Sequence, residues 1–225
     1  MKIAILGTGM VGQNIAAKLS SLKHEVTIGT RDPKATLART EKDAMGNPPF
    51  KDWHAQNSGV KLATFAEAAA FGELAFAVLN GSGALAALRA AKDGLAGKIL
   101  IDVSNPLDFS KGFPPSLTVC NTDSLGEQIQ KELPQTKCVK TLNTTNAMLM
   151  VNPGALAGAE HTMFVCGNDA DAKAKVTTLL QSFGWKDVID LGDITNARGT
   201  EMILPIWVRL FGALKTPMFN FKVVR

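Results

Sequence analysis

Short apolar runs and segments of helical spacing alternate along the chain. Continuous apolar runs of this length are typical of parallel strands buried on both faces, and they predict strands at residues 2–6, 25–29, 60–63, 74–79, 98–103 and 138–142. Between them, apolar residues three or four positions apart predict helices at residues 10–22, 34–44, 65–71, 84–91 and 124–133. Regular alternation of this kind predicts an α/β fold with a doubly wound parallel sheet.

Capping and turn residues refine these elements. Ser124 and Glu127 form a capping box at the start of one helix, and Asp169 is placed to cap another. Turn-forming residues are so frequent between 46 and 59 that we expect a loop there, and residues 107–122 read as an irregular connection.

The part of the chain after residue 150 is shorter and holds fewer predicted elements. Its pattern predicts strands at 162–166 and 187–191, a helix at 170–183, and a long, mostly apolar helix from 195 to about 214 that Pro205 interrupts. We therefore expect a main domain at residues 1–150 and a small C-terminal α+β domain at residues 151–225.

Composition narrows the class of protein. With 225 residues, 46% of them apolar, the chain can bury a core without disulfides. The net charge of +4 is small and the basic residues are dispersed, so we expect no nucleic-acid partner. Three cysteines without a CxxC spacing predict neither a disulfide framework nor a metal site. With no visible signal peptide or membrane span, we expect a cytoplasmic protein that does not bind membranes.

A glycine motif joins the first strand to the first helix. Gly7, Gly9 and Gly12 form GxGxxG in the strand-to-helix context that is typical of a dinucleotide site. The first glycine permits a tight turn, the second admits the pyrophosphate, and the third lets helix and strand pack closely. The helix N-terminus also attracts the anion. These features predict a Rossmann-type sheet that binds a dinucleotide.

The end of the second strand bears on which dinucleotide is bound. NAD sites place an acidic residue here for the ribose hydroxyls, whereas NADP sites supply cations for the 2′-phosphate. Thr30 and Arg31 come first in this chain, and Lys34 follows one helical turn later, which favours NADP. Asp32 is the alternative ribose ligand, but Asp32-Pro33 also reads as an N-cap followed by proline at the first helical position.

Few residues are suited to acid–base catalysis. The chain has no tyrosine, and we expect its three histidines, His24, His54 and His161, to lie at the surface. Asn105 and Asn143 end two strands, where their amides could hold a ligand or simply form turns. We therefore predict no catalytic side chain.

Several motifs together resemble one family. The stretch "KIAILGTGMVGQNIAAKLSSLKHEVTIGTRD", and later "SNP", "VKTLNT" and "DLGDITNAR", are similar to the NADP-dependent oxidoreductases that use the deazaflavin coenzyme F420. The resemblance extends over nearly the whole chain. It implies reversible hydride transfer between NADPH and F420 in a cleft between a dinucleotide-binding domain and a small C-terminal domain, in a homodimer.

The resemblance also implies roles for particular residues. Pyrophosphate would be contacted by Thr8, Gly9, Met10 and Val11, the 2′-phosphate by Thr30, Arg31 and Lys34, and the nicotinamide side by Leu79 and Asn80. The chain departs from the family at "VLNGSG", where members often have a "VP" turn, and at residues 46–59, which look like an insertion. Both departures concern the second substrate, for which a flavin or a quinone is an alternative.

Two other functions stay open at this point. A reductase of a small carbonyl or hydroxyacid substrate would need a proton donor, and a non-catalytic NADP(H)-binding sensor would need only the glycine motif.

The C-terminal helix adds an expectation about assembly. Residues 201–214 are apolar on nearly every face, so we expect a homodimer that buries Ile206, Trp207, Leu210 and Phe211.

Overall fold

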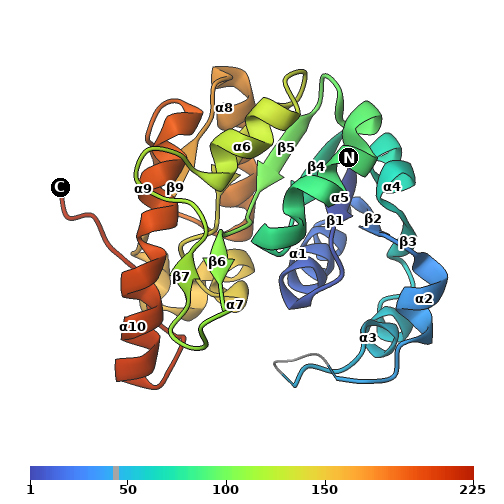
Figure 1. The fold of residues 1–225 in the computed structure, drawn as a ribbon, viewed down its shortest axis with the longest axis horizontal. Helices are drawn as coiled ribbons and strands as arrows, with labels where there is room; N and C mark the ends of the chain where they lie inside the picture. Colours follow the sequence, from blue (N-terminus) through green and yellow to red (C-terminus); the bar gives the residue numbers. More distant parts are fainter. Residues whose placement is uncertain (43–45) are drawn as a thin grey trace.

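A computed structural model describes residues 1–42 and 46–225. Its main feature is a single eight-stranded sheet with helices on both faces (Figure 1). The strand order is β10-β9-β8-β5-β4-β1-β2-β3. The strands are β1 (Lys2–Leu6), β2 (Glu25–Thr30), β3 (Lys61–Thr64), β4 (Leu74–Ala77), β5 (Ile99–Asp102), β8 (Lys137–Thr141), β9 (Thr162–Cys166) and β10 (Asp187–Asp190).

All neighbouring strands are parallel except β8 and β9. The order β3-β2-β1-β4-β5-β8 is that of the doubly wound dinucleotide-binding fold, which confirms the predicted fold class. Strands β9 and β10 continue the same sheet beyond β8, with Lys140 of β8 opposite Cys166 of β9. The sheet therefore runs without a break from the N-terminal part of the chain into its C-terminal part.

The core consists of two layers, one on each face of the sheet. Because successive strand residues point to opposite faces, Ile3 and Ile5 pack with α1, α7 and α8, whereas Ala4 and Leu6 pack with α4, α5 and α6. The helices are α1 (Met10–Ser21), α2 (Pro33–Ala38), α3 (Phe50–Gln56), α4 (Phe65–Phe71), α5 (Gly81–Leu95), α6 (Leu125–Glu132), α7 (Ala147–Val151), α8 (Ala170–Phe183), α9 (Ala197–Met202) and α10 (Leu204–Leu214).

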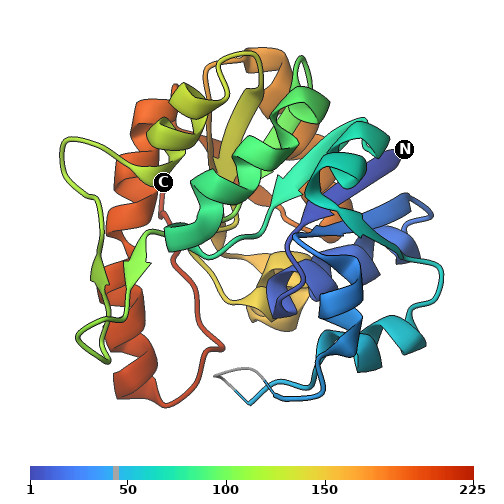
Figure 2. The same cartoon turned by 45° about the vertical axis from the view of Figure 1, so that its right-hand side comes forward.

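Most of the predicted elements are confirmed, and so are the two N-caps, although the Glu127 carboxylate accepts from the Ser124 hydroxyl instead of completing the predicted capping box. Ser124 accepts a hydrogen bond from the backbone N–H of Glu127, and Asp169 accepts one from that of Ala172. The short antiparallel pair β6 (Leu107–Asp108) and β7 (Ser116–Leu117) lies within the connection that was expected to be irregular. In Figure 2 this pair stands beside α10.

The prediction of a loop at 46–59 is wrong, because α3 lies inside it. Phe50 is buried and its ring lies 5.6 Å from that of Trp53, so two apolar side chains one turn apart hold a short helix against the core. The many turn residues on either side concealed it. Helix α2 ends at Ala38, earlier than expected, and residues 43 and 44 of the predicted helix lie outside the described residues.

The C-terminal helical stretch is divided rather than kinked. Helix α9 ends at Met202, and α10 begins at Leu204 with Pro205 in its first turn, where a missing backbone N–H costs nothing. Helix α7, which sequence periodicity did not predict, covers the sheet next to α1. No described helix combines the length and the apolarity needed to cross a membrane.

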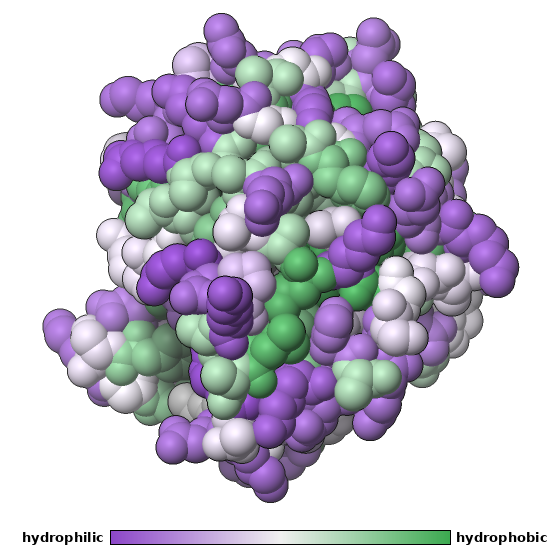
Figure 3. Space-filling model, turned by 90° about the vertical axis from the view of Figure 1, so that its right-hand side faces the viewer, coloured by the Kyte–Doolittle hydropathy of each residue, from purple (hydrophilic) through white to green (hydrophobic). Residues whose placement is uncertain are grey.

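The side of the molecule formed around α2 to α4 is largely hydrophilic, with one apolar strip across its middle (Figure 3). The opposite side carries α10 and the C-terminal tail, which is held against β9 by a hydrogen bond of 2.9 Å from the backbone N–H of Thr162 to the carbonyl of Phe221.

Candidate functional site

The sheet has a topological switch point between β1 and β4. These strands pair in parallel, with Leu6 opposite Ala77, although the chain continues from β1 to β2 on the other side. In open α/β sheets, ligands bind outside the carboxyl ends of the strands at such a point. The glycine loop follows β1 and residues 78–80 follow β4, so the structure brings these two predicted site segments to one crevice.

The glycine loop has the geometry of a phosphate cradle. Gly7 has φ +131°, and a Cβ there would lie 2.5 Å from the carbonyl oxygen of Val78. A Cβ at Gly12 would lie 2.4 Å from the Gly7 oxygen, so both glycines are required by the fold itself. Gly9 differs, because no atom lies within 4 Å of its ideal Cβ. The fold leaves this space open at the N-terminus of α1, an end of the helix that favours an anion.

The segment after β2 presents two cations to solvent. Arg31 and Lys34 are exposed, and neither has a hydrogen-bond or ion-pair partner within residues 1–42 and 46–225. Thr30 is buried, and its hydroxyl lies 2.9 Å from that of Thr36. Asp32 caps α2 by accepting a hydrogen bond of 3.0 Å from the N–H of Ala35, as the interpretation of Asp32-Pro33 as a helix start predicted.

The residues after β4 open the next helix. Asn80 is the N-cap of α5, and its side-chain oxygen accepts hydrogen bonds from the N–H and hydroxyl of Ser82. Leu79 is half-buried against the α5 face of the sheet. A Cβ at Gly81 would lie 2.2 Å from the backbone carbonyl oxygen of Asn105. This glycine therefore lets α5 approach the segment after β5 closely.

Asn105 and Asn143 bind each other. The side-chain nitrogen of Asn143 donates to the side-chain oxygen of Asn105 at 3.0 Å and to the carbonyl of Thr200 at 3.0 Å, while that of Asn105 donates to the Asn143 carbonyl at 2.9 Å. The pair therefore joins the ends of β5 and β8 to α9. These bonds join residues 38 and 57 positions apart in the sequence, so the two amides cross-link distant segments instead of forming local turns.

A buried charge cluster lies beside this pair, and sequence reasoning missed it. The Lys140 ammonium lies 2.8 Å from Asp102 and 2.8 Å from Glu201, and all three side chains are at most 1% exposed. Glu201 also accepts the backbone N–H groups of Leu125 and Gly126 at the start of α6. Burial disfavours the charge of Lys140, but the two carboxylates outweigh burial and raise its pKa. The sequence held one sign of this cluster: Asp102 and Lys140 each interrupt a strand that is otherwise apolar.

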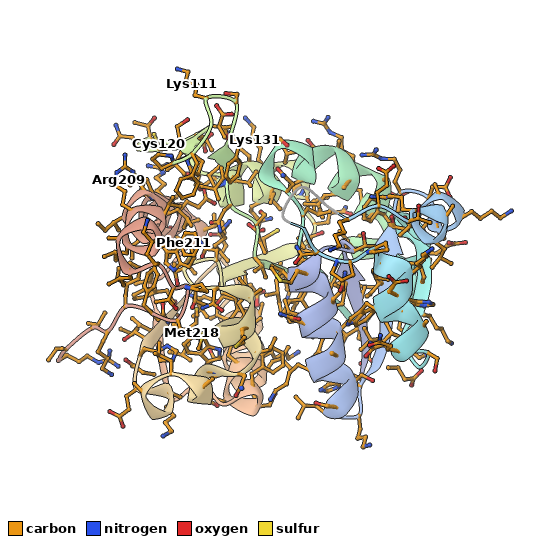
Figure 4. All side chains as sticks on the ribbon, turned by 90° about the horizontal axis from the view of Figure 1, so that it is seen from below. Lys111, Cys120, Lys131, Arg209, Phe211 and Met218 are labelled. Carbon is orange, nitrogen blue, oxygen red and sulfur yellow. The ribbon has the colours of Figure 1, made fainter. Side chains whose placement is uncertain are left out.

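Aromatic side chains gather along α10. Trp207 stacks on Phe211 with ring centroids 6.0 Å apart and lies 5.1 Å from Phe219, while Phe113, between β6 and β7, meets Phe211 edge-on at 6.5 Å. Phe113 is 62% exposed. In Figure 4, Phe211 and Met218 lie inward of α10, whereas Lys111 and Arg209 lie toward the outer edge. These rings form an aromatic wall of Phe113, Trp207, Phe211 and Phe219.

The thiols and histidines do not form a catalytic group. Burial raises the pKa of Cys166 to about 12 and also raises that of Cys138, so neither is a thiolate at neutral pH.

The expectation that His161 lies at the surface is wrong. It is 3% exposed, and its ring contacts the Pro153 carbonyl at 3.0 Å and the Asn220 side-chain nitrogen at 2.7 Å. In the described part of the chain, no group of three or more His, Cys, Asp or Glu side chains could hold a metal ion.

A solved structure decides the family. The crystal structure of a protein from Arthrobacter sp. FB24, provisionally named an F420-dependent NADP-reductase, is known at 1.70 Å resolution. Its sequence is 61% identical to this chain over 100% of both chains, and the two structures superpose with a TM-score of 0.96. The chain belongs to the F420-dependent NADP reductase family. The family model described as "NADP oxidoreductase coenzyme F420-dependent" also matches residues 2–106 of this reductase.

More distant relatives carry the same name. The F420-dependent NADP reductase of Methanothermobacter marburgensis is 28% identical over 214 residues, which cover 93% of this chain and 92% of the relative. That of Methanocaldococcus jannaschii is 29% identical over 215 residues, which cover 93% and 92%. These comparisons confirm the family that the sequence motifs indicated.

Proposed function

We propose that this reductase transfers a hydride between NADP(H) and F420, the acceptor after which its relatives are named. The observation that carries the proposal is full-length similarity to an F420-dependent NADP-reductase, combined with an open glycine cradle at the switch point of the sheet. The two coenzymes supply the chemistry: the dihydronicotinamide gives up a hydride, and the deazaflavin accepts it together with a proton from water. The protein contributes binding and alignment.

In this proposal, residues 1–150 bind the dinucleotide. Thr8, Gly9, Met10 and Val11 contact the pyrophosphate, where the open space at Gly9 and the N-terminus of α1 favour an anion. The 2′-phosphate is held by the cations of Arg31 and Lys34, which have no protein partner in the described chain, with Thr30 beside them. The nicotinamide side of the crevice is formed by Leu79, Asn80, Asn105 and Asn143.

Residues 151–225 contribute to the acceptor site and to dimerisation. The aromatic wall offers flat apolar surfaces of the kind that a fused ring system stacks on. Carbonyl reduction would need a proton donor beside the substrate. The chain has no tyrosine, and His161 is enclosed by Pro153 and Asn220, so a deazaflavin is the better supported acceptor.

The proposal also includes a homodimer. Ile206 is 48% exposed and Met202 is 41% exposed, and both lie on the C-terminal helices. Apolar residues grouped in this way are typical of a surface that another subunit covers.

The test is turnover with a panel of acceptors. Purified protein is mixed with NADPH and either F420, FMN, FAD or a quinone, and both NADPH oxidation and acceptor reduction are followed by absorbance. We expect rapid turnover with F420 and little with the others. Tight NADPH binding without turnover of any acceptor would instead support the sensor function.

A further inference from the structure

A cavity lies against the outer side of the glycine loop. Its volume is about 490 Å³. One wall is the start of α1, with Thr8, Gly9 and Gln13, and the other is the segment that follows α2, including Arg39 and Lys42. Gln13 donates a hydrogen bond of 2.9 Å to the Thr8 carbonyl and so fixes the loop from within this cavity.

The charges around the cavity favour an anion. Among the described residues that line it, Arg39 and Lys42 are cationic and Glu41 is the single carboxylate, so these residues together carry one net positive charge in addition to the N-terminus of α1. None of these three side chains has an ion pair with any residue that the structure describes. Elsewhere, Arg89, Arg198 and Arg225 are all paired with carboxylates.

The position of Arg39 is set by the fold. It is the C-cap of α2, and the preceding helix is held to the sheet through the buried contact between Thr36 and Thr30. A planar guanidinium on an anchored backbone is well suited to bind two phosphate oxygens at once. Arg31 and Lys34, the proposed ligands of the 2′-phosphate, do not line this cavity.

We propose that Arg39 is a further dinucleotide-binding residue and that it contacts the pyrophosphate. The segment after α2 then forms the outer wall of the cradle, opposite the backbone of the glycine loop. This inference rests on the proposed NADP(H) site. It assigns the pyrophosphate rather than the 2′-phosphate because the cavity is bounded by the loop that surrounds Gly9.

The experiment compares three ligands by isothermal titration calorimetry: NADPH, NADH and 2′-AMP, which has a 2′-phosphate but no pyrophosphate. A charge-assisted hydrogen bond at a solvent-accessible site corresponds to a loss of roughly tenfold. We therefore expect Arg39→Ala to weaken NADPH and NADH by the same factor, roughly tenfold, and to leave 2′-AMP unchanged. Lys175→Ala, on the exposed side of α8, is the control with the same change in net charge.

Other outcomes would overturn the inference. A loss confined to NADPH and 2′-AMP would assign Arg39 to the 2′-phosphate. Unchanged binding would make Arg39 a surface residue, and an equal loss in Lys175→Ala would assign the effect to overall charge. Thermal denaturation of each variant verifies folding, which we expect to be unaffected because Arg39 is exposed. A wild-type protein that binds neither dinucleotide would overturn the proposed function itself.

Discussion

At the scale of single residues, the three glycines of the loop have different roles. Gly7 and Gly12 are required by the fold, whereas Gly9 borders open space. We predict that Gly9→Val abolishes NADPH binding without lowering the melting temperature, because the side chain would occupy the place of the pyrophosphate. Gly12→Val is the matched comparison, and it should lower the melting temperature because its Cβ would meet the Gly7 oxygen at 2.4 Å. Undiminished binding in Gly9→Val would disprove the cradle.

Arg31 is expected to determine the choice between NADPH and NADH. It is exposed and has no partner in the described chain, so its guanidinium is available for the 2′-phosphate. A charge-assisted hydrogen bond contributes about 1.5–3 kcal/mol, so Arg31→Ala should weaken NADPH binding roughly 10- to 150-fold. NADH should be nearly unaffected, as competition titrations can show. If the wild type prefers NADH, the NADP assignment is wrong.

At the scale of elements, the cluster of Asp102, Lys140 and Glu201 joins β5, β8 and α9. Removing the cation leaves two buried carboxylates facing each other, so we predict that Lys140→Met lowers the free energy of unfolding by about 3–5 kcal/mol. Lys137→Met on the same strand is the control, because Lys137 is 44% exposed in its pair with Asp169 and such pairs contribute at most about 1 kcal/mol. Equal losses in urea denaturation would show that burial of the cluster is unimportant.

The C-terminal tail is held to β10 by Asp187. Hydrogen bonds from Thr162, Lys222 and Arg225 lower the pKa of this carboxyl from 3.8 to about 2, although partial burial opposes them. A depressed pKa in the folded state stabilises the protein above the unfolded pKa, and the stabilisation is lost as the pH falls through the folded value.

Asp187→Asn should therefore lower the melting temperature at pH 7. We expect the difference from the wild type to shrink as the pH falls from about 4 to about 2, the interval between the two pKa values. Calorimetry across this range measures it. A difference that stays constant with pH would mean that Asp187 acts through packing alone.

At the scale of the whole molecule, assembly depends on the outer side of the C-terminal helices. Trp207 and Phe211 are engaged with each other inside the chain, so Ile206 and Leu210 are the better probes of an interface. We predict that the wild type is a homodimer at micromolar concentration and that Ile206→Glu makes it monomeric, because a two-fold interface buries each substitution twice.

Light scattering coupled to gel filtration measures this directly. Lys175→Glu on α8 is the control, since it introduces an acidic residue on an exposed helix position away from α10. A wild-type protein that is monomeric at this concentration would contradict the homodimer, and it would leave the cofactor assignment untouched.

The sequence by itself determined the local features of this protein. Apolar runs and helical spacing located the strands and most helices, because burial on a sheet face or along a helix stripe imposes a period on neighbouring residues. The glycine loop was also predicted, since each glycine answers a constraint within a few residues. The caps Asp32, Ser124 and Asp169 were predicted for the same reason. Helix α3 was missed because its short apolar pair lies among turn residues.

Only the tertiary structure decided which distant residues meet. Residues 102, 140 and 201 form one charge cluster because β5 and β8 are adjacent in the sheet and α9 folds back over their ends. Asn105 and Asn143 are paired by the same adjacency. His161 is buried because the C-terminal tail returns to β9 and covers it. No local period encodes such meetings, because they depend on the path of the whole backbone and on the packing that selects it.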